Sequence, residues 1–144
     1  MAKTFQLSVV TPEGSVVDAD ATSAVFPAYD GEYGVLPGHA PLLCLVGIGE
    51  LRVSTEGEDR RSTTRSWYVD GGFAEVSDDK MIILTEEAVP VAELSVKEAE
   101  KLLEQARNMT VTGPDEQAHR EATYARGRVQ KRLARQVMAT KGMP

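Results

Sequence analysis

The hydrophobic periodicity of this chain changes near residue 90, and this change constrains the fold more than any other feature. Before it, short runs rich in β-branched and aromatic residues alternate apolar and polar positions, as at Phe5, Leu7 and Val9. Turn residues separate these runs at close intervals, for example Asp30-Gly31 and Asp70-Gly71-Gly72. Many short strands with no helical period between them predict a β-sandwich or barrel rather than alternating strands and helices.

After residue 90 the sequence takes a helical period. Ser95 followed by Glu98 is a capping-box signature, and helix formers continue to Met109. A break at Thr112-Gly113-Pro114 separates this helix from a second one, predicted from Asp115 to about Ala139. The expected fold is therefore α+β in two parts: an N-terminal antiparallel β-sandwich over residues 1–90, then a C-terminal antiparallel two-helix hairpin over residues 91–144.

Each predicted helix has an apolar stripe. In the first helix it consists of Val96, Ala99, Leu103, Ala106 and Met109. In the second helix, at roughly 100° per residue, small and apolar residues lie on one arc and basic residues on the other. The apolar arc contains Ala118, Ala122, Ala125, Val129, Leu133 and Val137, and the basic arc contains Arg120, Arg128, Lys131, Arg132 and Arg135, with Arg126 at the apolar edge. Because alanine buries little surface, we expect the second helix to be held weakly.

The charge is unevenly distributed along the chain. Residues 1–90 contain 15 acidic and 6 basic side chains, a balance of −9. Residues 114–144 contain 3 acidic and 7 basic side chains, a balance of +4. An acidic body with a basic tail favours an acidic partner for the tail, although a solvated helix face would have the same composition.

Several function classes are disfavoured by the sequence. The single cysteine, Cys44, lies in an apolar stretch and is expected to be a buried, inert thiol, so disulfides do not stabilise the fold. No apolar run has the roughly 20 residues that a membrane-spanning helix needs, and no signal-peptide pattern is found, so we expect a cytoplasmic protein. His39 and His119 lie far apart in the sequence, so no metal site is expected.

Three functional alternatives remain from the residues alone. A β-sandwich hydrolase would act through His39 with Asp30 or Glu32, but the sequence offers no second convergent catalytic group. A stand-alone adaptor or ligand sensor would use the hairpin to bind a partner. Nucleic-acid binding through the basic helix is disfavoured by the acidic body and by the lack of paired aromatic residues near the arginines.

Four segments in order resemble the epsilon subunit of bacterial F-type ATP synthases, the counterpart of the mitochondrial delta subunit. They are Leu7–Gly14, Gly31–Leu42, Gly49–Leu51 and Gly71–Val76, of which Gly31–Leu42 is the most specific. The resemblance implies a non-catalytic rotor-stalk subunit that connects the membrane-embedded c-ring to the gamma shaft. It would lie peripherally at the cytoplasmic face of the bacterial inner membrane, and no direct membrane insertion or nucleic-acid partner is expected.

The resemblance also assigns contact residues. Gly31, Glu32 and His39 match positions that face the c-ring, and Thr11 matches a position that lies toward gamma. Leu42 and Leu43 are further candidates for the gamma contact, with packing in the sandwich core as the alternative.

In this family the hairpin either folds against the sandwich or extends along the shaft. When extended, its basic second helix meets acidic segments of the beta or alpha subunits and impedes ATP hydrolysis. The sequence does not establish which arrangement is the resting one. The matching inhibitory residues are Arg126, Arg128, Lys131, Arg132 and Arg135.

Some members of the family bind ATP on the folded hairpin through an aliphatic residue, Asp, two variable positions, Arg and Ala. Leu94 and Ala99 retain this motif, but Ser95 replaces the Asp and Glu98 replaces the Arg. Arg128 and Arg132 match basic positions of the second helix. A carboxylate in place of the phosphate-binding Arg repels the nucleotide, so ATP binding is disfavoured and no cofactor is expected.

Overall fold

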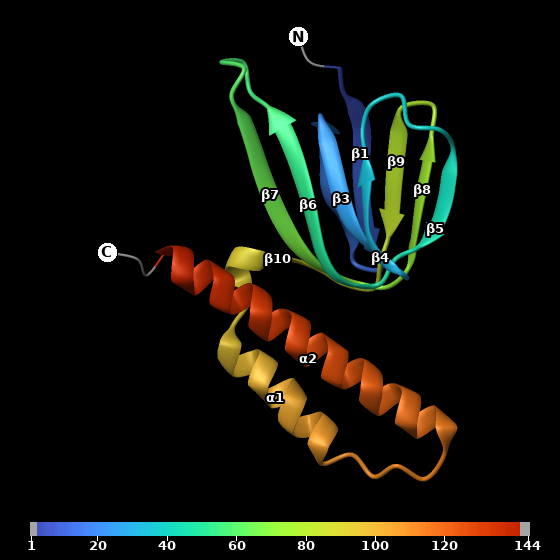
Figure 1. Ribbon diagram of the computed structural model, residues 1–144, viewed down its shortest axis with the longest axis vertical. Coiled ribbons are helices and arrows are strands. Elements are labelled where there is room, and N and C mark those ends of the chain that lie inside the picture. The colour runs from blue at the N-terminus through green and yellow to red at the C-terminus, as the bar shows by residue number, and fades with distance from the viewer. Residues whose placement is uncertain (1–2, 142–144) are drawn as a thin grey trace. The chain divides into compact units, whose positions relative to one another are not determined.

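The computed structural model describes residues 3–141, and the chain divides into two compact units between Val89 and Pro90. The first unit contains two five-stranded sheets that face each other (Figure 1). The second contains a short 3₁₀ helix and two long helices. The expected fold class, a β-sandwich followed by a two-helix hairpin, is confirmed.

The two sheets have the orders β2-β1-β9-β8-β5 (sheet A) and β10-β7-β6-β3-β4 (sheet B). Several strands, such as β1, β7 and β9, coincide with runs rich in β-branched or aromatic residues, whereas β2 and β3 are separated only by Thr22. The strands of sheet A are β2 (Gly14–Ala21), β1 (Phe5–Thr11), β9 (Lys80–Leu84), β8 (Phe73–Ser77) and β5 (Leu42–Leu45). Those of sheet B are β10 (Ala88–Pro90), β7 (Ser62–Asp70), β6 (Ile48–Glu56), β3 (Ser23–Ala28) and β4 (Gly31–Val35).

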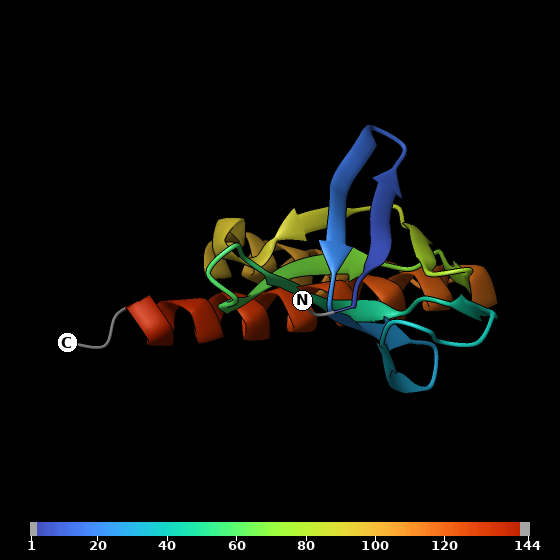
Figure 2. The same cartoon turned by 90° about the horizontal axis from the view of Figure 1, so that it is seen from above.

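The sandwich differs from the expected antiparallel pattern at one strand pair. β1 and β2 form an antiparallel hairpin, which Figure 2 shows as an extended ribbon. On its other side, β1 pairs in parallel with β9, so that Leu7 lies opposite Met81 and Val9 opposite Ile83. The parallel orientation is possible because the chain passes through both sheets between these strands, whereas a tight turn forces an antiparallel pair.

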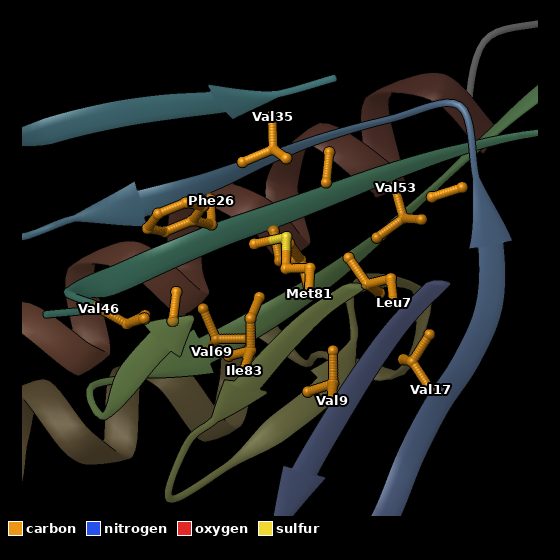
Figure 3. Close-up of a cluster of buried hydrophobic side chains, with 14 of the residues drawn as sticks. Leu7, Val9, Val17, Phe26, Val35, Val46, Val53, Val69, Met81 and Ile83 are labelled. Atoms are coloured by element: carbon orange, nitrogen blue, oxygen red, sulfur yellow. The ribbon is translucent and has the colours of Figure 1, made fainter. Parts of the chain in front are cut away.

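The core lies between the sheets and comes from alternate residues of nearly every strand (Figure 3). In β9, for example, Met81 and Ile83 are buried while Ile82 and Leu84 are exposed. This alternation is the period-2 pattern of a half-buried strand. Cys44 is half-buried at the margin of the core rather than fully buried as expected, because β5 is the edge strand of sheet A.

The helical unit consists of η1 (Val91–Glu93), α1 (Val96–Arg107) and α2 (Pro114–Lys141). The Ser95 hydroxyl caps α1 by accepting a hydrogen bond from the Glu98 backbone N–H at 3.3 Å, as the sequence predicts. The Glu98 carboxylate does not complete the capping box but pairs with Lys101 at 3.1 Å. Residues 108–113 separate the two helices, and α2 begins at Pro114. The two helices lie side by side (Figure 1).

The apolar stripe of α1 is confirmed, but that of α2 is partly wrong. Ala99 and Ala106 of α1 are fully buried. In α2, Leu133 is buried as expected, whereas Ala118 is exposed and the other residues of the stripe are half-buried. Gly127 of α2 packs closely against α1, since an added Cβ there would lie 2.8 Å from the Leu103 Cδ2 atom. Small size, rather than hydrophobicity, allows the two helices to approach there.

Candidate functional site

The outer face of sheet A contains a row of large apolar side chains. Val10, Leu84, Phe73 and Leu45 are register partners on the neighbouring strands β1, β9, β8 and β5. Leu84, Phe73 and Leu45 leave 47%, 52% and 51% of their surface exposed. We refer to these four residues as the apolar row. Contiguous exposed apolar side chains are uncommon on monomeric proteins and mark sites where a partner binds.

The apolar row is extended on two sides. Leu43 and Ile82 occupy the next register of the same face, where Glu75 lies between them, and Leu43 is 70% exposed. Near Val10, Thr11 helps to line a recess of about 320 Å³ together with Phe73 and Leu84. The outer face of sheet A is thus a mainly apolar surface with a hollow at one end.

Of the three residues predicted to contact gamma, two lie at this surface and one does not. Thr11 lies at the recess and Leu43 lies on the exposed outer face. Leu42 is half-buried and packs against the core, which favours the core alternative for this residue. Since successive side chains of a strand point to opposite faces, Leu42 and Leu43 cannot both face outward.

The residues predicted to contact the c-ring lie in β4, an edge strand of sheet B, and in the connection that follows it. Gly31 and Glu32 are exposed at its start. The Arg52 guanidinium donates hydrogen bonds to Glu32 at 2.9 Å and to Glu50 at 3.0 Å. Hydrogen bonding to Glu32, and then to Glu50, raises the pKa of Arg52 above its ordinary value. Glu32 therefore presents a carboxylate that is held in place on the surface.

His39 follows β4 and packs against Tyr33. Its Nδ1 donates to the Ala40 carbonyl at 2.6 Å, which leaves Nε2 to accept from the Tyr33 hydroxyl at 3.2 Å. Tyr33 packs in turn on Phe26 of the core, with 5.6 Å between ring centroids. Because Glu32 and Tyr33 are adjacent in a strand, Glu32 and His39 lie on the two sides of the β4 edge rather than in one cluster.

The basic residues of α2 fall into two groups. Arg120 donates through Nε to the Ala106 carbonyl at 3.0 Å, and Lys131 pairs with Glu100 at 3.2 Å, so both face α1. Arg128, Arg132 and Arg135 are exposed, and the Arg128 guanidinium lies 5.7 Å from the Tyr124 ring centroid. These three arginines and Lys131 line one depression of about 490 Å³ with Leu103. Arg126 is half-buried and lies outside this depression.

Two of the six residues of the degenerate nucleotide motif line the depression described above. Arg128 and Arg132 line the depression, but Leu94, Ser95, Glu98 and Ala99 do not. Ser95 caps α1, Glu98 pairs with Lys101, and Ala99 is buried with its carbonyl next to Gly127. The first half of the motif therefore has structural roles in this hairpin.

Comparison with known proteins identifies the family. The family model for the β-sandwich domain of the ATP synthase delta/epsilon chain matches residues 4–91. The ATP synthase epsilon chain of Rhodopirellula baltica is 39% identical over 127 residues, which cover 88% of this chain and 95% of that protein. This chain belongs to the ATP synthase epsilon family. The epsilon chain of Granulibacter bethesdensis is 42% identical over 106 residues, covering 74% of this chain and 75% of that protein.

Solved structures share the fold of this epsilon-family chain. A chain of the Tetrahymena thermophila mitochondrial ATP synthase, from a structure of the central stalk and c-ring, superposes with a TM-score of 0.69 at 12% identity, covering 90% of this chain and 95% of that one. A chain of the Euglena gracilis mitochondrial ATP synthase gives a TM-score of 0.64 at 24% identity, covering 98% of this chain and 82% of that one. At these identities the similarity concerns the fold alone.

As an epsilon-family member, the chain is a non-catalytic accessory subunit of the ATP synthase and takes part in ATP synthesis and ion transport. The hydrolase alternative at His39 is therefore set aside. Within residues 3–141, no group of three His, Cys, Asp or Glu side chains is placed to hold a metal ion. No helix in this part of the chain is long and apolar enough to cross a membrane.

Sequence reasoning missed the apolar row of this epsilon-family chain, although a signal for it was present. The runs Leu42-Leu43-Cys44-Leu45 and Met81-Ile82-Ile83-Leu84 are apolar at successive positions. In a sandwich strand, alternate residues fill the core, so a run that is apolar at every position also has an apolar outer face. That pattern predicts that something covers the outside of β5 and β9.

Proposed function

We propose that this chain is the rotor-stalk subunit that joins the gamma shaft to the c-ring of an F-type ATP synthase, and that its hairpin inhibits ATP hydrolysis. The apolar row is the observation that supports this proposal most strongly. A subunit that transmits torque needs a stable interface on each side, and stable interfaces are apolar at their centre. The sandwich body then acts as a rigid clamp and needs no catalytic group.

The gamma subunit is the proposed occupant of the apolar row. Phe73 lies between Leu45 and Leu84 in the row, which is the central position that interface hot spots prefer. Thr11 and Leu43 border the same surface. The recess of about 320 Å³ beside Phe73 would accept one apolar side chain of the shaft.

The c-ring is the proposed partner of the β4 edge. Gly31 and Glu32 present small and charged groups on the edge strand β4, and His39 presents an aromatic group from the connection that follows it. Glu32 is fixed by Arg52, and His39 is fixed by Tyr33 and Ala40. Fixed polar groups suit the polar loops of a ring, because less conformational entropy is lost on docking.

We place the chain peripherally at the cytoplasmic face of the bacterial inner membrane, bound through these two surfaces to gamma and the ring. The coupling ion is determined by another subunit. Protons are the commoner ion, and the epsilon chain of Propionigenium modestum, 37% identical over 109 residues, is named as sodium ion specific.

The inhibitory element in this proposal is the exposed part of α2. Arg128, Arg132 and Arg135 would contact acidic segments of the beta or alpha subunits when the arm is extended. Lys131 is already paired with Glu100, so it would contribute only after that ion pair breaks. Single exposed ion pairs contribute about 0.2 to 1 kcal/mol, but several formed together could bias a two-state arm about tenfold or more.

Copurification tests the assembly. Gently solubilised membranes should yield gamma, beta and ring subunits together with an affinity-tagged form of this chain. A chain that purifies alone from the soluble fraction would contradict the proposal and favour the stand-alone adaptor or ligand sensor. The tagged chain with Thr63→Asp, an exposed substitution on β7 away from both surfaces, serves as a matched control and should copurify normally.

We expect no tight ATP binding to the hairpin. Glu98 places a carboxylate where a phosphate-binding arginine is needed, and Ser95 and Ala99 are engaged in capping and packing. Isothermal titration of the full chain with ATP should therefore give no binding in the micromolar range. If ATP binds with a micromolar dissociation constant and Arg128→Ala weakens that binding, the depression on α2 does bind nucleotides.

A further inference from the structure

The connection between β4 and β5 crosses from one sheet to the other and contains His39. Within it, the His39 backbone N–H donates to the Leu36 carbonyl at 3.1 Å, which closes a four-residue turn. Pro37 and Gly38 occupy the central positions, and Gly38 has a φ of +82°. This is the arrangement of a type II turn, in which proline precedes a residue with positive φ. The turn fixes its own shape but does not by itself attach the connection to sheet A.

Asp79 provides that attachment. The Gly38 N–H donates to the Asp79 Oδ1 atom at 2.7 Å, across 41 positions of sequence. Among the described residues, this is the hydrogen bond that ties residues 36–41 to sheet A. Hydrogen bonds to a carboxylate are shorter and stronger than those between neutral groups.

Asp79 is itself rigidly held. It follows Asp78 in the turn between β8 and β9, where Asp78 has a φ of +52° and Asp79 a φ of +57°. Its carbonyl accepts a hydrogen bond from the Gln6 N–H of β1 at 2.9 Å. Two consecutive residues with positive φ form a type I′ hairpin turn, which asparagine and glycine also suit. An aspartate at the second position therefore adds a carboxylate that is used outside the turn.

We propose that Asp79 is a positioning residue for the docking loop: by holding Gly38, it places His39 at the β4 edge before the ring binds. Gly38 precedes His39 directly, and the His39 ring is oriented by the adjacent Ala40 carbonyl and by Tyr33. A shift of the turn would therefore move His39 and Ala40 relative to Tyr33, which is held in β4 against Phe26. The proposal rests on the proposed function only in naming the c-ring as the partner.

Hydrogen exchange on the full chain tests the positioning role without any partner. Asp79→Gly removes the acceptor, and Asp78→Gly removes an equivalent carboxylate from the same turn. Glycine suits positive φ at both positions, so both variants keep the hairpin. We expect the Gly38 amide to exchange about tenfold faster in Asp79→Gly and unchanged in Asp78→Gly. In Asp79→Asn the side-chain amide oxygen still accepts, so exchange should stay close to that of the original chain. Unchanged exchange in Asp79→Gly, or an equal rise in Asp78→Gly, would overturn the proposal.

Dissociation from a detergent-solubilised complex of gamma and c-ring tests the docking role. Asp79→Gly should dissociate about threefold faster than Asp78→Gly, because the loop must be ordered again on binding. His39→Ala is the reference. If His39→Ala dissociates faster and Asp79→Gly does not, the positioning role for docking is wrong. If His39→Ala has no effect, the ring contact in the proposed function fails, while the exchange rates still decide whether Asp79 holds the loop.

Discussion

Removing residues 112–144 should raise the ATPase activity of the assembled enzyme about five- to tenfold. The reason is that α2 carries three exposed arginines, Arg128, Arg132 and Arg135, which line one depression and, in the proposed extended arm, would contact the catalytic subunits. Losing several partly desolvated ion pairs at once corresponds to a shift of this size in a two-state equilibrium. The measurement is steady-state ATP hydrolysis by purified complex that contains either the full or the truncated chain.

A finer variant separates charge from the helix itself. Replacing Arg128, Arg132 and Arg135 together by alanine should give most of the increase in ATPase activity, because it removes the charges while alanine preserves the helix. Lys101→Ala combined with Arg107→Ala removes exposed cations from α1 of the same hairpin and should leave hydrolysis unchanged. Equal activity of the truncated and full complexes would rule out the inhibitory role, and an effect of the α1 pair as large as that of the α2 set would refute the assignment to α2.

Introducing a carboxylate at the centre of the apolar row should prevent stable assembly with gamma. Phe73→Asp removes the aromatic ring that lies between Leu45 and Leu84 and places a charge where the interface excludes water. Truncating a central aromatic residue costs about 2 to 4 kcal/mol of binding, and a buried unpaired charge costs more. We expect the dissociation constant for gamma to rise at least about 100-fold, as measured by titration of the full chain against purified gamma.

Folding of this variant can be checked independently. Phe73 is 52% exposed, so its replacement removes little from the core, and the thermal midpoint should change by only a few degrees. Leu45→Asp, at the edge of the same row, provides a second variant with the same expected direction. Thr63→Asp adds an equal charge to an exposed strand position of sheet B and should bind gamma normally. If Phe73→Asp and Leu45→Asp both bind gamma normally, gamma does not bind at the apolar row.

The sequence predicted local structure well because local rules determine it. Strands appear where β-branched runs lie between turn residues, and α1 begins at Ser95, where a hydroxyl precedes a helical run. The same rules predict the positions of Gly38 and of the Asp78-Asp79 turn, because few residues accept a positive φ.

Tertiary placement was less predictable. The two faces of α2 could not be assigned from hydropathy, because the side toward α1 is not apolar. On that side Arg120 donates to a backbone carbonyl, Gly127 allows the helices to approach closely, and Lys131 forms an ion pair. The contact between Asp79 and Gly38 joins residues 41 positions apart, and no local pattern indicates it. Strand alternation could have chosen between Leu42 and Leu43, but only once the register of β5 was known.

The parallel pairing of β1 with β9 has a consequence for how the chain folds during synthesis. β1 leaves the ribosome first, yet one of its two neighbours is not synthesised until residue 84 has been added. Until then β1 and β2 are hydrogen-bonded only to each other within sheet A, and an isolated two-stranded hairpin is at best marginally stable. The sandwich therefore closes late, in one long-range step. The C-terminal helical hairpin depends on contacts between helices that are adjacent in sequence, so it can form quickly.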